Sequence, residues 1–274
     1  MRFLSLLFFC WVFTSCIQFR LSEEEFVSTF ENQEVLPKQA DLIIDSSNIH
    51  YVYTDQGRDE LLVFVHGSPG SWSAFIDFFK NDSLLSRFDM VSIDRPGFGD
   101  SDYGMPEKSL EKQAYFLSRV IELFPQKNKI MIGHSLGGPV IARIAMDYPN
   151  LTQGMVMVAP SIDPDMEKYE WYRTWIGTKI VGSITPKDFW VSNEEILPLK
   201  EELQLMLPLW GKIIIPTVLV QGTKDVMVPK ENAEFARKMF RTEILTINYL
   251  EGVNHFIPWS NPEEIVRGIY LVSR

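Results

Sequence analysis

A serine between two glycines is the feature of this sequence with the clearest chemical potential. Ser135 stands in Gly133-His134-Ser135-Leu136-Gly137, directly after the apolar run 130–132. A G-x-S-x-G turn between a strand and a helix exposes the serine hydroxyl, and its glycines leave room for the neighbouring elements. A serine hydroxyl is a poor nucleophile at neutral pH unless a base removes its proton. Ser135 is therefore the candidate nucleophile, and the chain must supply the base.

Four histidines are available, and their positions favour one of them. His255 lies in the segment GVNHF after the last apolar strand, where it is free to reach Ser135. His134 would point away from the tip of the serine turn, and His50 belongs to an early hairpin. His66 lies in a loop rich in glycine and proline, which it would brace through hydrogen bonds. Elimination leaves His255 as the base.

The base needs a carboxylate that holds its tautomer and stabilises the imidazolium. Asp225 follows an apolar strand at the same predicted sheet edge as the serine, and Asp163, after the preceding strand, is the competing acid. Asp94 precedes a Pro-Gly pair, which indicates a structural role in a turn. The chain order Ser135, Asp225, His255 is the order that a G-x-S-x-G strand–turn–helix site requires.

Charge that develops on the carbonyl oxygen must be met by N–H groups already in place. One candidate donor is the backbone N–H of Leu136, directly after the nucleophile. The loop after the strand 61–65 should supply the second, and Ser68 is our choice, because Pro69 has no N–H.

Strands and helices alternate from about residue 40, which predicts a mostly parallel sheet covered by helices. The apolar runs predict a hairpin (42–44 and 49–53) and strands at 61–65, 90–93, 129–132, 155–158, 213–220 and 243–248. Helical spacing marks 109–124, 136–148, 230–240 and 261–272. The fold class is α/β, with an eight-stranded sheet in a core formed by 40–161 and 211–274. Residues 162–210 interrupt the alternation and predict a helical cap.

These motifs resemble the α/β-hydrolase-fold serine hydrolases. HGSPG, DRPGFGDSD, GHSLGG, GTKDVMVP and GVNHF occur in the order and spacing of that family over residues 40–273. The resemblance implies a triad of Ser135, Asp225 and His255, an oxyanion hole from Ser68 and Leu136, and a cap. HGSPG is similar to the HGGPG of prolyl aminopeptidases, whereas DRPG looks more like the esterases and carbon–carbon bond hydrolases. A serine at the turn, in place of aspartate, separates the chain from dehalogenases and epoxide hydrolases.

The expected reaction is hydrolysis of a carboxylic ester of a small or medium-sized substrate through an acyl-enzyme. Cleavage of a short peptide or of a carbon–carbon bond, perhydrolysis without a cofactor, and a non-enzymatic binding module are the alternatives. Within the aromatic-rich cap, Trp171, Trp175 and Trp190 are candidate substrate contacts, together with His66.

The composition restricts the kinds of ligand and partner that the protein is expected to bind. The net charge of −10 argues against nucleic acid, because phosphate binding needs a basic surface. Cysteine occurs only at Cys10 and Cys16, and the histidines form no HxH or HExxH pair, so we expect neither a metal site nor a cofactor.

The amino terminus predicts export. Residues 3–13 form an apolar run behind Arg2, and the Phe13-Thr14-Ser15-Cys16 that follows resembles a lipobox of bacterial lipoproteins. We therefore expect a signal peptide at 1–15, a lipidated Cys16 that anchors the chain to a bacterial membrane, and a flexible tether at 16–39. A plain signal peptide, giving a periplasmic or secreted protein, and an uncleaved anchor are the alternatives.

Overall fold

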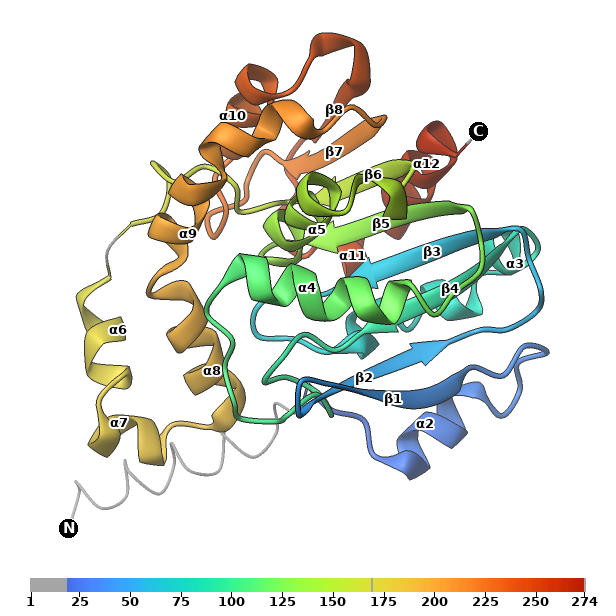
Figure 1. Ribbon diagram of the computed structural model, residues 1–274, viewed down its shortest axis with the longest axis horizontal. Helices are drawn as coiled ribbons and strands as arrows, with labels where there is room; N and C mark the ends of the chain where they lie inside the picture. The colour runs from blue at the N-terminus through green and yellow to red at the C-terminus, as the bar shows by residue number, and fades with distance from the viewer. Residues whose placement is uncertain (1–18, 169, 274) are drawn as a thin grey trace.

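The computed structural model describes residues 19–168 and 170–273, and an eight-stranded sheet runs through them (Figure 1). The sheet order is β1-β2-β4-β3-β5-β6-β7-β8. β1 pairs antiparallel with β2 and β2 with β4, and every later pairing is parallel. The strands are β1 (Lys38–Ile44), β2 (Ser47–Tyr53), β3 (Glu60–Val65), β4 (Phe88–Ile93), β5 (Asn128–His134), β6 (Gly154–Val158), β7 (Thr217–Gly222) and β8 (Leu245–Leu250).

Both faces of the sheet are buried, and the alternation of side chains along β3 shows why its sequence is apolar throughout. Leu61, Val63 and Val65 pack into one hydrophobic cluster, whereas Leu62 and Phe64 pack into the other. Successive side chains of a strand point to opposite faces, so a strand with helices on both sides reads as a continuous apolar run.

Helices cover the two faces. Residues of α4, α5 and α10 belong to the first cluster, and residues of α2, α3, α11 and α12 belong to the second. The helices are α2 (Glu23–Phe30), α3 (Asp82–Leu85), α4 (Leu110–Ile121), α5 (Gly137–Asp147), α10 (Glu231–Met239), α11 (Ile257–Ser260) and α12 (Pro262–Val272).

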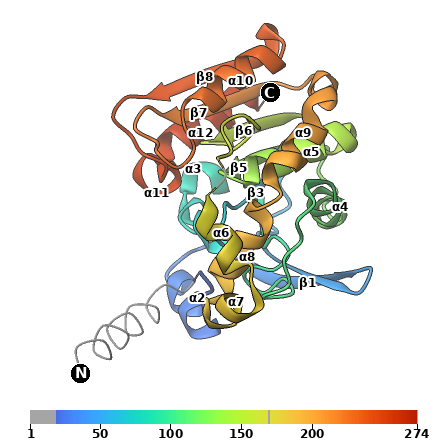
Figure 2. The same cartoon turned by 90° about the vertical axis from the view of Figure 1, so that its left-hand side faces the viewer.

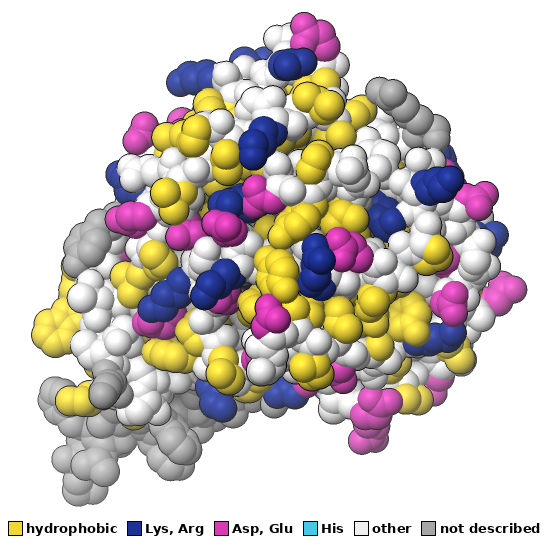
Figure 3. Space-filling view, in the orientation of Figure 1, with side chains coloured by type: hydrophobic (Ala, Val, Ile, Leu, Met, Phe, Trp, Pro, Cys, Tyr) yellow, Lys and Arg dark blue, Asp and Glu magenta, His cyan; other side chains and the backbone are white. Residues whose placement is uncertain are grey.

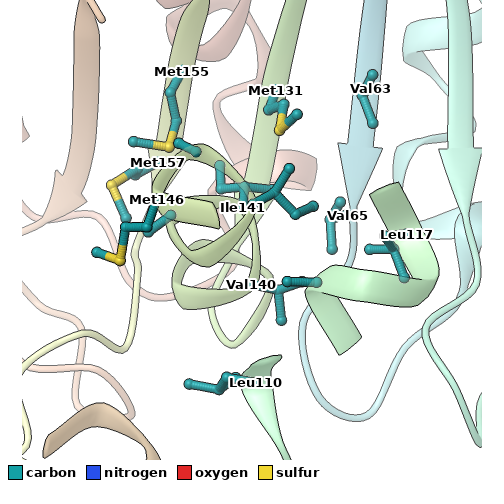
Figure 4. Packing of buried hydrophobic residues seen from close by; sticks show 14 of the residues in the cluster. Val63, Val65, Leu110, Leu117, Met131, Val140, Ile141, Met146, Met155 and Met157 are labelled. Atoms are coloured by element: carbon teal, nitrogen blue, oxygen red, sulfur yellow. The ribbon is translucent and has the colours of Figure 1, made fainter. Parts of the chain in front are cut away.

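The first cluster fixes α5, the helix that opens at the candidate nucleophile. Val140 and Ile141 of α5 lie against β3 and β5, with Met131 of β5 beside them (Figure 4). On the other side of α5, Met146 and Met157 fill the space next to β6 (Figure 4). Because these side chains are fully or almost fully buried, the turn between β5 and α5 is held at both ends.

The sequence-based fold class is confirmed: the architecture is α/β with an eight-stranded, mostly parallel sheet. The predicted hairpin is present, and its turn residues Asp45 and Ser46 have φ angles of 49° and 73°. β7 and β8 begin later than predicted, at Thr217 and Leu245, because Pro216 precedes β7 and a 3₁₀ turn, Thr242–Ile244, precedes β8.

The predicted tether is wrong for the part of 16–39 that the structure describes. Ser22 caps α2 in a reciprocal capping box with Glu25, and Phe30 at the end of α2 is buried against the body. The ring of Phe26 lies 5.7 Å from that of Trp72. Glu23, Glu24 and Glu25 occupy the first turn of α2, where the helix dipole favours acidic side chains.

Between β6 and β7 the chain forms four helices: α6 (Trp171–Ile176), α7 (Lys179–Ile184), α8 (Lys187–Ile196) and α9 (Leu199–Met206). They lie beyond the carboxyl ends of the parallel strands, and Figure 2 turns α6, α7 and α8 toward the viewer. We call 162–210 the cap.

The predicted signal peptide at 1–15 and the predicted lipidation of Cys16 lie outside the described residues. Among the helices that the structure does describe, none combines the length and the hydropathy needed to cross a membrane.

Replacement of Phe30 by alanine should lower the free energy of unfolding by about 3 kcal/mol, because a large aromatic ring that is 2% exposed would leave a cavity. Val27→Ala is the matched control, since Val27 lies on the same helix and is 55% exposed. Urea denaturation followed by circular dichroism measures both. Equal, small effects would mean that α2 does not pack on the body.

Candidate active site

Ser135 occupies a strained turn between β5 and α5. Its φ is 54°, in the left-handed region that side chains rarely adopt, and its N–H donates to Val158 O at 2.9 Å. A Cβ added to Gly137 would lie 2.2 Å from Val65 O, so only glycine allows α5 to start this close to β3. The turn therefore holds the serine hydroxyl at the carboxyl edge of the sheet.

His255 and Asp225 form the hydrogen bond that the chemistry requires. His255 Nδ1 lies 2.7 Å from Asp225 Oδ2, and both side chains are almost completely buried. The other oxygen of Asp225 accepts the N–H groups of Met227 and Val228 at 2.9 and 2.8 Å. A carboxylate only accepts, so the imidazole proton lies on Nδ1 and Nε2 is left as the basic atom. Ser135 and His255 line the same cavity.

Asp163, the competing acid, makes its hydrogen bonds to groups other than His255. Asp163 accepts the N–H of Asp165 and donates its own N–H to the Asn232 amide oxygen, both at 2.9 Å. The contacts of Asp163 are thus those of a local turn. The geometry favours Asp225 as the partner of His255.

His134 supports the candidate base. Its Nε2 lies 3.0 Å from His255 O, and the two rings are 4.7 Å apart. Burial, together with the neighbouring His255, lowers the pKa of His134 to about 3. The ring is therefore neutral, its Nε2–H donates to His255 O, and it fixes the backbone of the base without competing for its proton.

The two predicted oxyanion donors face the cavity. Ser68 and Leu136 line it together with Ser135 and His255. A Cβ on Gly67 would lie 2.9 Å from the Cβ of Ser135, which brings the loop after β3 directly against the nucleophile. Within the described part of the chain, no hydrogen bond from the N–H of Ser68 or of Leu136 is found. Both groups are available to a developing oxyanion.

The cavity measures about 350 Å³, and its other walls come from the cap and from the turn after β7. These walls carry both charged and apolar side chains, among them Glu167, Lys168, Tyr172, Arg173, Met227 and Val228. The site is therefore a mixed-polarity pocket of a size that suits a small molecule or one end of a longer one.

The predicted substrate contacts are wrong. Trp171 and Trp175 are 69% and 63% exposed and lie outside the cavity, because they occupy the outer side of α6. Trp190 is half-buried against Gly182 of α7, and His66 is buried beneath the oxyanion loop. The inward side of α6 instead presents Tyr172 and Arg173.

A buried arginine joins the oxyanion loop to the cap. The Arg95 guanidinium, fully buried, donates to His66 O and Gly67 O at 2.9 and 2.8 Å. The same group makes a two-pronged ion pair with Glu195 of α8, at 2.6 and 3.0 Å. Burial, together with the Arg95 charge, lowers the pKa of His66 well below its usual value. Neutral His66 donates from Nδ1 to Gly67 O and accepts the Arg95 N–H on Nε2.

Asp94 braces two loops, in keeping with its predicted structural role. It accepts the N–H of Trp72 at 2.6 Å and that of Asp100 at 2.9 Å. Burial raises its pKa from 3.8 to about 6, against the effect of these two hydrogen bonds.

One group of the described residues has potential metal ligands close together: His50, Asp94 and Asp100, with atoms within 4.8 Å of one another. These residues do not line the cavity that holds Ser135. Asp100 also forms an ion pair with Arg20, and Asp94 is engaged by backbone N–H groups. Nothing in this arrangement links a metal to the serine chemistry.

The sequence reasoning missed three supporting residues: His134, Arg95 and Glu195. Arg95 and Glu195 are a hundred positions apart, and no local pattern pairs them. A signal for Arg95 did exist, because it stands within DRPGFGDSD, directly after an apolar strand, where a buried charge requires a partner.

Comparison with known proteins agrees with the fold. A family profile described as alpha/beta hydrolase fold matches residues 60–189. The chain is 34% identical over 121 residues to the pimeloyl-[acyl-carrier protein] methyl ester esterase of Proteus mirabilis (strain HI4320), covering 39% of this chain and 43% of that protein. It is 39% identical over 108 residues to a probable 1-acylglycerol-3-phosphate O-acyltransferase of Oryza sativa subsp. japonica, covering 36% and 25%.

Among solved structures, Cfl2 of Burkholderia cenocepacia superimposes with a TM-score of 0.70 at 17% identity, over 86% of this chain and 95% of that one. The alignments span less than half the length of the curated relatives reported above. The fold of the chain is that of the α/β hydrolases.

Removing one partner of the Arg95–Glu195 pair should lower the free energy of unfolding more than removing both partners. Glu195→Gln leaves a buried guanidinium without its counter-charge and should cost about 3 kcal/mol of unfolding free energy. The double variant Arg95→Met/Glu195→Met should cost less, because no unpaired charge remains. Urea unfolding compares the two variants, and a double variant that is less stable than Glu195→Gln would contradict the pairing.

The raised pKa of Asp94 predicts a pH-dependent stability. The folded carboxyl binds its proton more tightly than the unfolded one, so its contribution to stability is full below pH 3.8 and is lost as the pH rises through about 6. The unfolding free energy of the wild type, relative to Asp94→Asn, should fall by up to about 3 kcal/mol between pH 4 and pH 7. Denaturation of both proteins at the two pH values measures this difference. A constant or increasing difference would contradict it.

Proposed function

We propose that the protein is a serine hydrolase that cleaves a carboxylic ester through an acyl-enzyme. The observation that carries the proposal is the 2.7 Å hydrogen bond between His255 and Asp225, in the cavity wall that also holds Ser135. This bond leaves Nε2 of His255 as the atom that takes the proton of the Ser135 hydroxyl.

In the proposed reaction the Ser135 oxygen attacks the ester carbonyl, while His255 accepts the hydroxyl proton. The N–H groups of Ser68 and Leu136 stabilise the negative charge on the carbonyl oxygen. His255 then gives the proton to the leaving alkoxide, and water, activated by the same histidine, releases the acid. The esterase relative supports an ester as the substrate class, and the acyltransferase relative also handles an acyl group.

A peptidase that acts on a free amino terminus is the second candidate, and Glu167 favours it. This carboxyl lines the cavity and accepts a hydrogen bond from the Ser161 hydroxyl. Burial raises its pKa, and an ammonium group bound beside it would favour the ionised form. Glu167 could hold an ammonium group near Ser135. Preferential cleavage of proline naphthylamide over p-nitrophenyl esters, with a selective loss of the former in Glu167→Gln, would support this candidate.

The acidic residues on α8 and α9 offer less to such a substrate. Glu195 is committed to Arg95, Glu194 pairs with Lys108 at 2.6 Å, and Glu202 accepts the N–H of Leu110.

We further propose that the protein is exported and anchored through a lipid on Cys16. The apolar run 3–13 and the cysteine that follows Phe13-Thr14-Ser15 support this. Mass spectrometry of the mature amino terminus tests it: the expected product begins at a lipid-modified Cys16, and an unmodified start at Met1 would contradict it.

A fluorophosphonate probe should label the wild-type protein at Ser135, because labelling requires an activated serine. Ser135→Ala should abolish labelling and lower ester turnover by about 10⁴–10⁶-fold while leaving the unfolding transition unchanged. Ser161→Ala is the matched control, since Ser161 lines the same cavity without a histidine partner. A wild-type protein that binds the ester but resists the probe would favour a binding module.

A further inference from the structure

The outer side of the cap carries large apolar side chains that face solvent. Trp171 and Trp175 stand one turn apart on α6, and Ile180 and Ile184 stand one turn apart on α7. Their exposed fractions are 69%, 63%, 81% and 80%. Figure 3 shows hydrophobic side chains at this edge of the molecule, and Figure 2 shows α6 and α7 side by side. We call these four residues the outer cap face. Clustered apolar side chains of this size on a surface mark an interaction site.

The charge of the same segment is opposite to that of the whole chain. Residues 171–187 contain three basic residues and no acidic one, whereas the chain has a net charge of −10. Arg173 lies in the cavity wall and pairs with Glu170 at 2.6 Å, so Lys179 and Lys187 are the basic residues of this segment that remain for the surface. Tryptophan, aliphatic side chains and basic residues together are typical of helices that lie in the interface of a membrane. Basic residues near such a surface are attracted to anionic lipids. The charge pattern therefore favours an anionic surface over a neutral one, and the exposed tryptophans favour a bilayer as that surface.

The outer cap face is also close to the reaction. Tyr172 and Arg173, on the inward side of α6, line the cavity that contains Ser135. One helix thus separates the exposed tryptophans from the candidate active site.

The position at which the described chain begins agrees with this orientation. The ring of Phe19 contacts that of Phe189 on α8, with 6.2 Å between the ring centres. The eighteen residues that precede Phe19 include the apolar run 3–13. A membrane-bound leader or a lipid on Cys16 would therefore emerge next to the cap.

We propose that the outer cap face docks on an anionic lipid bilayer, and that the substrate is an acyl ester of a membrane lipid. The docking is argued from the surface of the protein and does not depend on the proposed function. The lipid substrate does rest on the proposed function. In the reaction the bond between the acyl carbon and the lipid's ester oxygen breaks, and the Ser135 oxygen forms a bond to that carbon. The Ser135 proton passes through His255 to the lipid alcohol, and water then replaces Ser135 to give the free fatty acid.

Fluorescence quenching by brominated lipids tests the docking in the full-length chain. Vesicles of phosphatidylglycerol and brominated phosphatidylcholine should quench Trp171 and Trp175. The double variant Trp171→Phe/Trp175→Phe should therefore show a smaller quenched fraction, although Trp11 in the leader is unchanged in both proteins. An equal quenched fraction in the two proteins would overturn the docking.

Hydrolysis tests the substrate class with a pair of matched variants. Ile180→Ser/Ile184→Ser should reduce hydrolysis of a fluorogenic acylglycerol held in the same vesicles about tenfold, and should leave hydrolysis of soluble p-nitrophenyl butyrate unchanged. Ile214→Ser/Leu271→Ser, at positions 61% and 62% exposed but away from the cap, should change neither rate.

The outcomes separate this inference from the proposed function. A wild-type protein that hydrolyses neither substrate contradicts the proposed function, while the quenching result still decides the docking. Hydrolysis of the soluble ester alone, or an equal loss in both paired variants, overturns the lipid substrate. Vesicle hydrolysis that is unchanged in Ile180→Ser/Ile184→Ser, with a dimer that dissociates in that variant, would assign the outer cap face to a second copy of the chain.

Discussion

The proton on Nδ1 of His255 is the feature on which the candidate site depends. Asp225 can accept that proton because two backbone N–H groups fix its other oxygen. The opposite nitrogen of His255 is then basic at the moment when the Ser135 hydroxyl must lose its proton. Three separate βα units supply these side chains, and the parallel sheet brings them together because its strands end at one edge. The packing of β5, β7 and β8 therefore also positions Ser135, Asp225 and His255 relative to one another.

A second constraint links the oxyanion loop to the cap. Arg95 holds the carbonyl groups of His66 and Gly67 and pairs with Glu195 on α8, all away from water. Such a pair contributes little net stability compared with apolar residues of the same size, but the loss of one partner is costly. The cap and the loop that should bind the oxyanion consequently keep one relative arrangement.

Local patterns were enough to predict the parts of this arrangement that depend on neighbouring residues. The turn at Ser135 and the strands of the sheet could be recognised, because turn chemistry and periodicity act over a few residues. The roles of Asp225 and His255 stay predictions. Arg95–Glu195 could not be predicted, since it joins residues that only the fold brings together.

The cap tryptophans and α2 were misassigned for a related reason. Their residue types are compatible with both exposed and buried positions, and tertiary packing determines which of the two each side chain takes. Trp171 and Trp175 face outward because Tyr172 and Arg173 take the inward side of α6. The acidic start of α2 proved to be a helix amino terminus, and Phe30 anchors its end.

The most direct test of the central claim is proton NMR of the imidazole N–H groups. The signal of the His255 Nδ1–H, identified by its absence in His255→Gln, should appear at low field because it donates to a buried carboxylate. It should persist in Asp163→Asn and should move to higher field or disappear in Asp225→Asn. An unchanged signal in Asp225→Asn, or its loss in Asp163→Asn, would contradict the account.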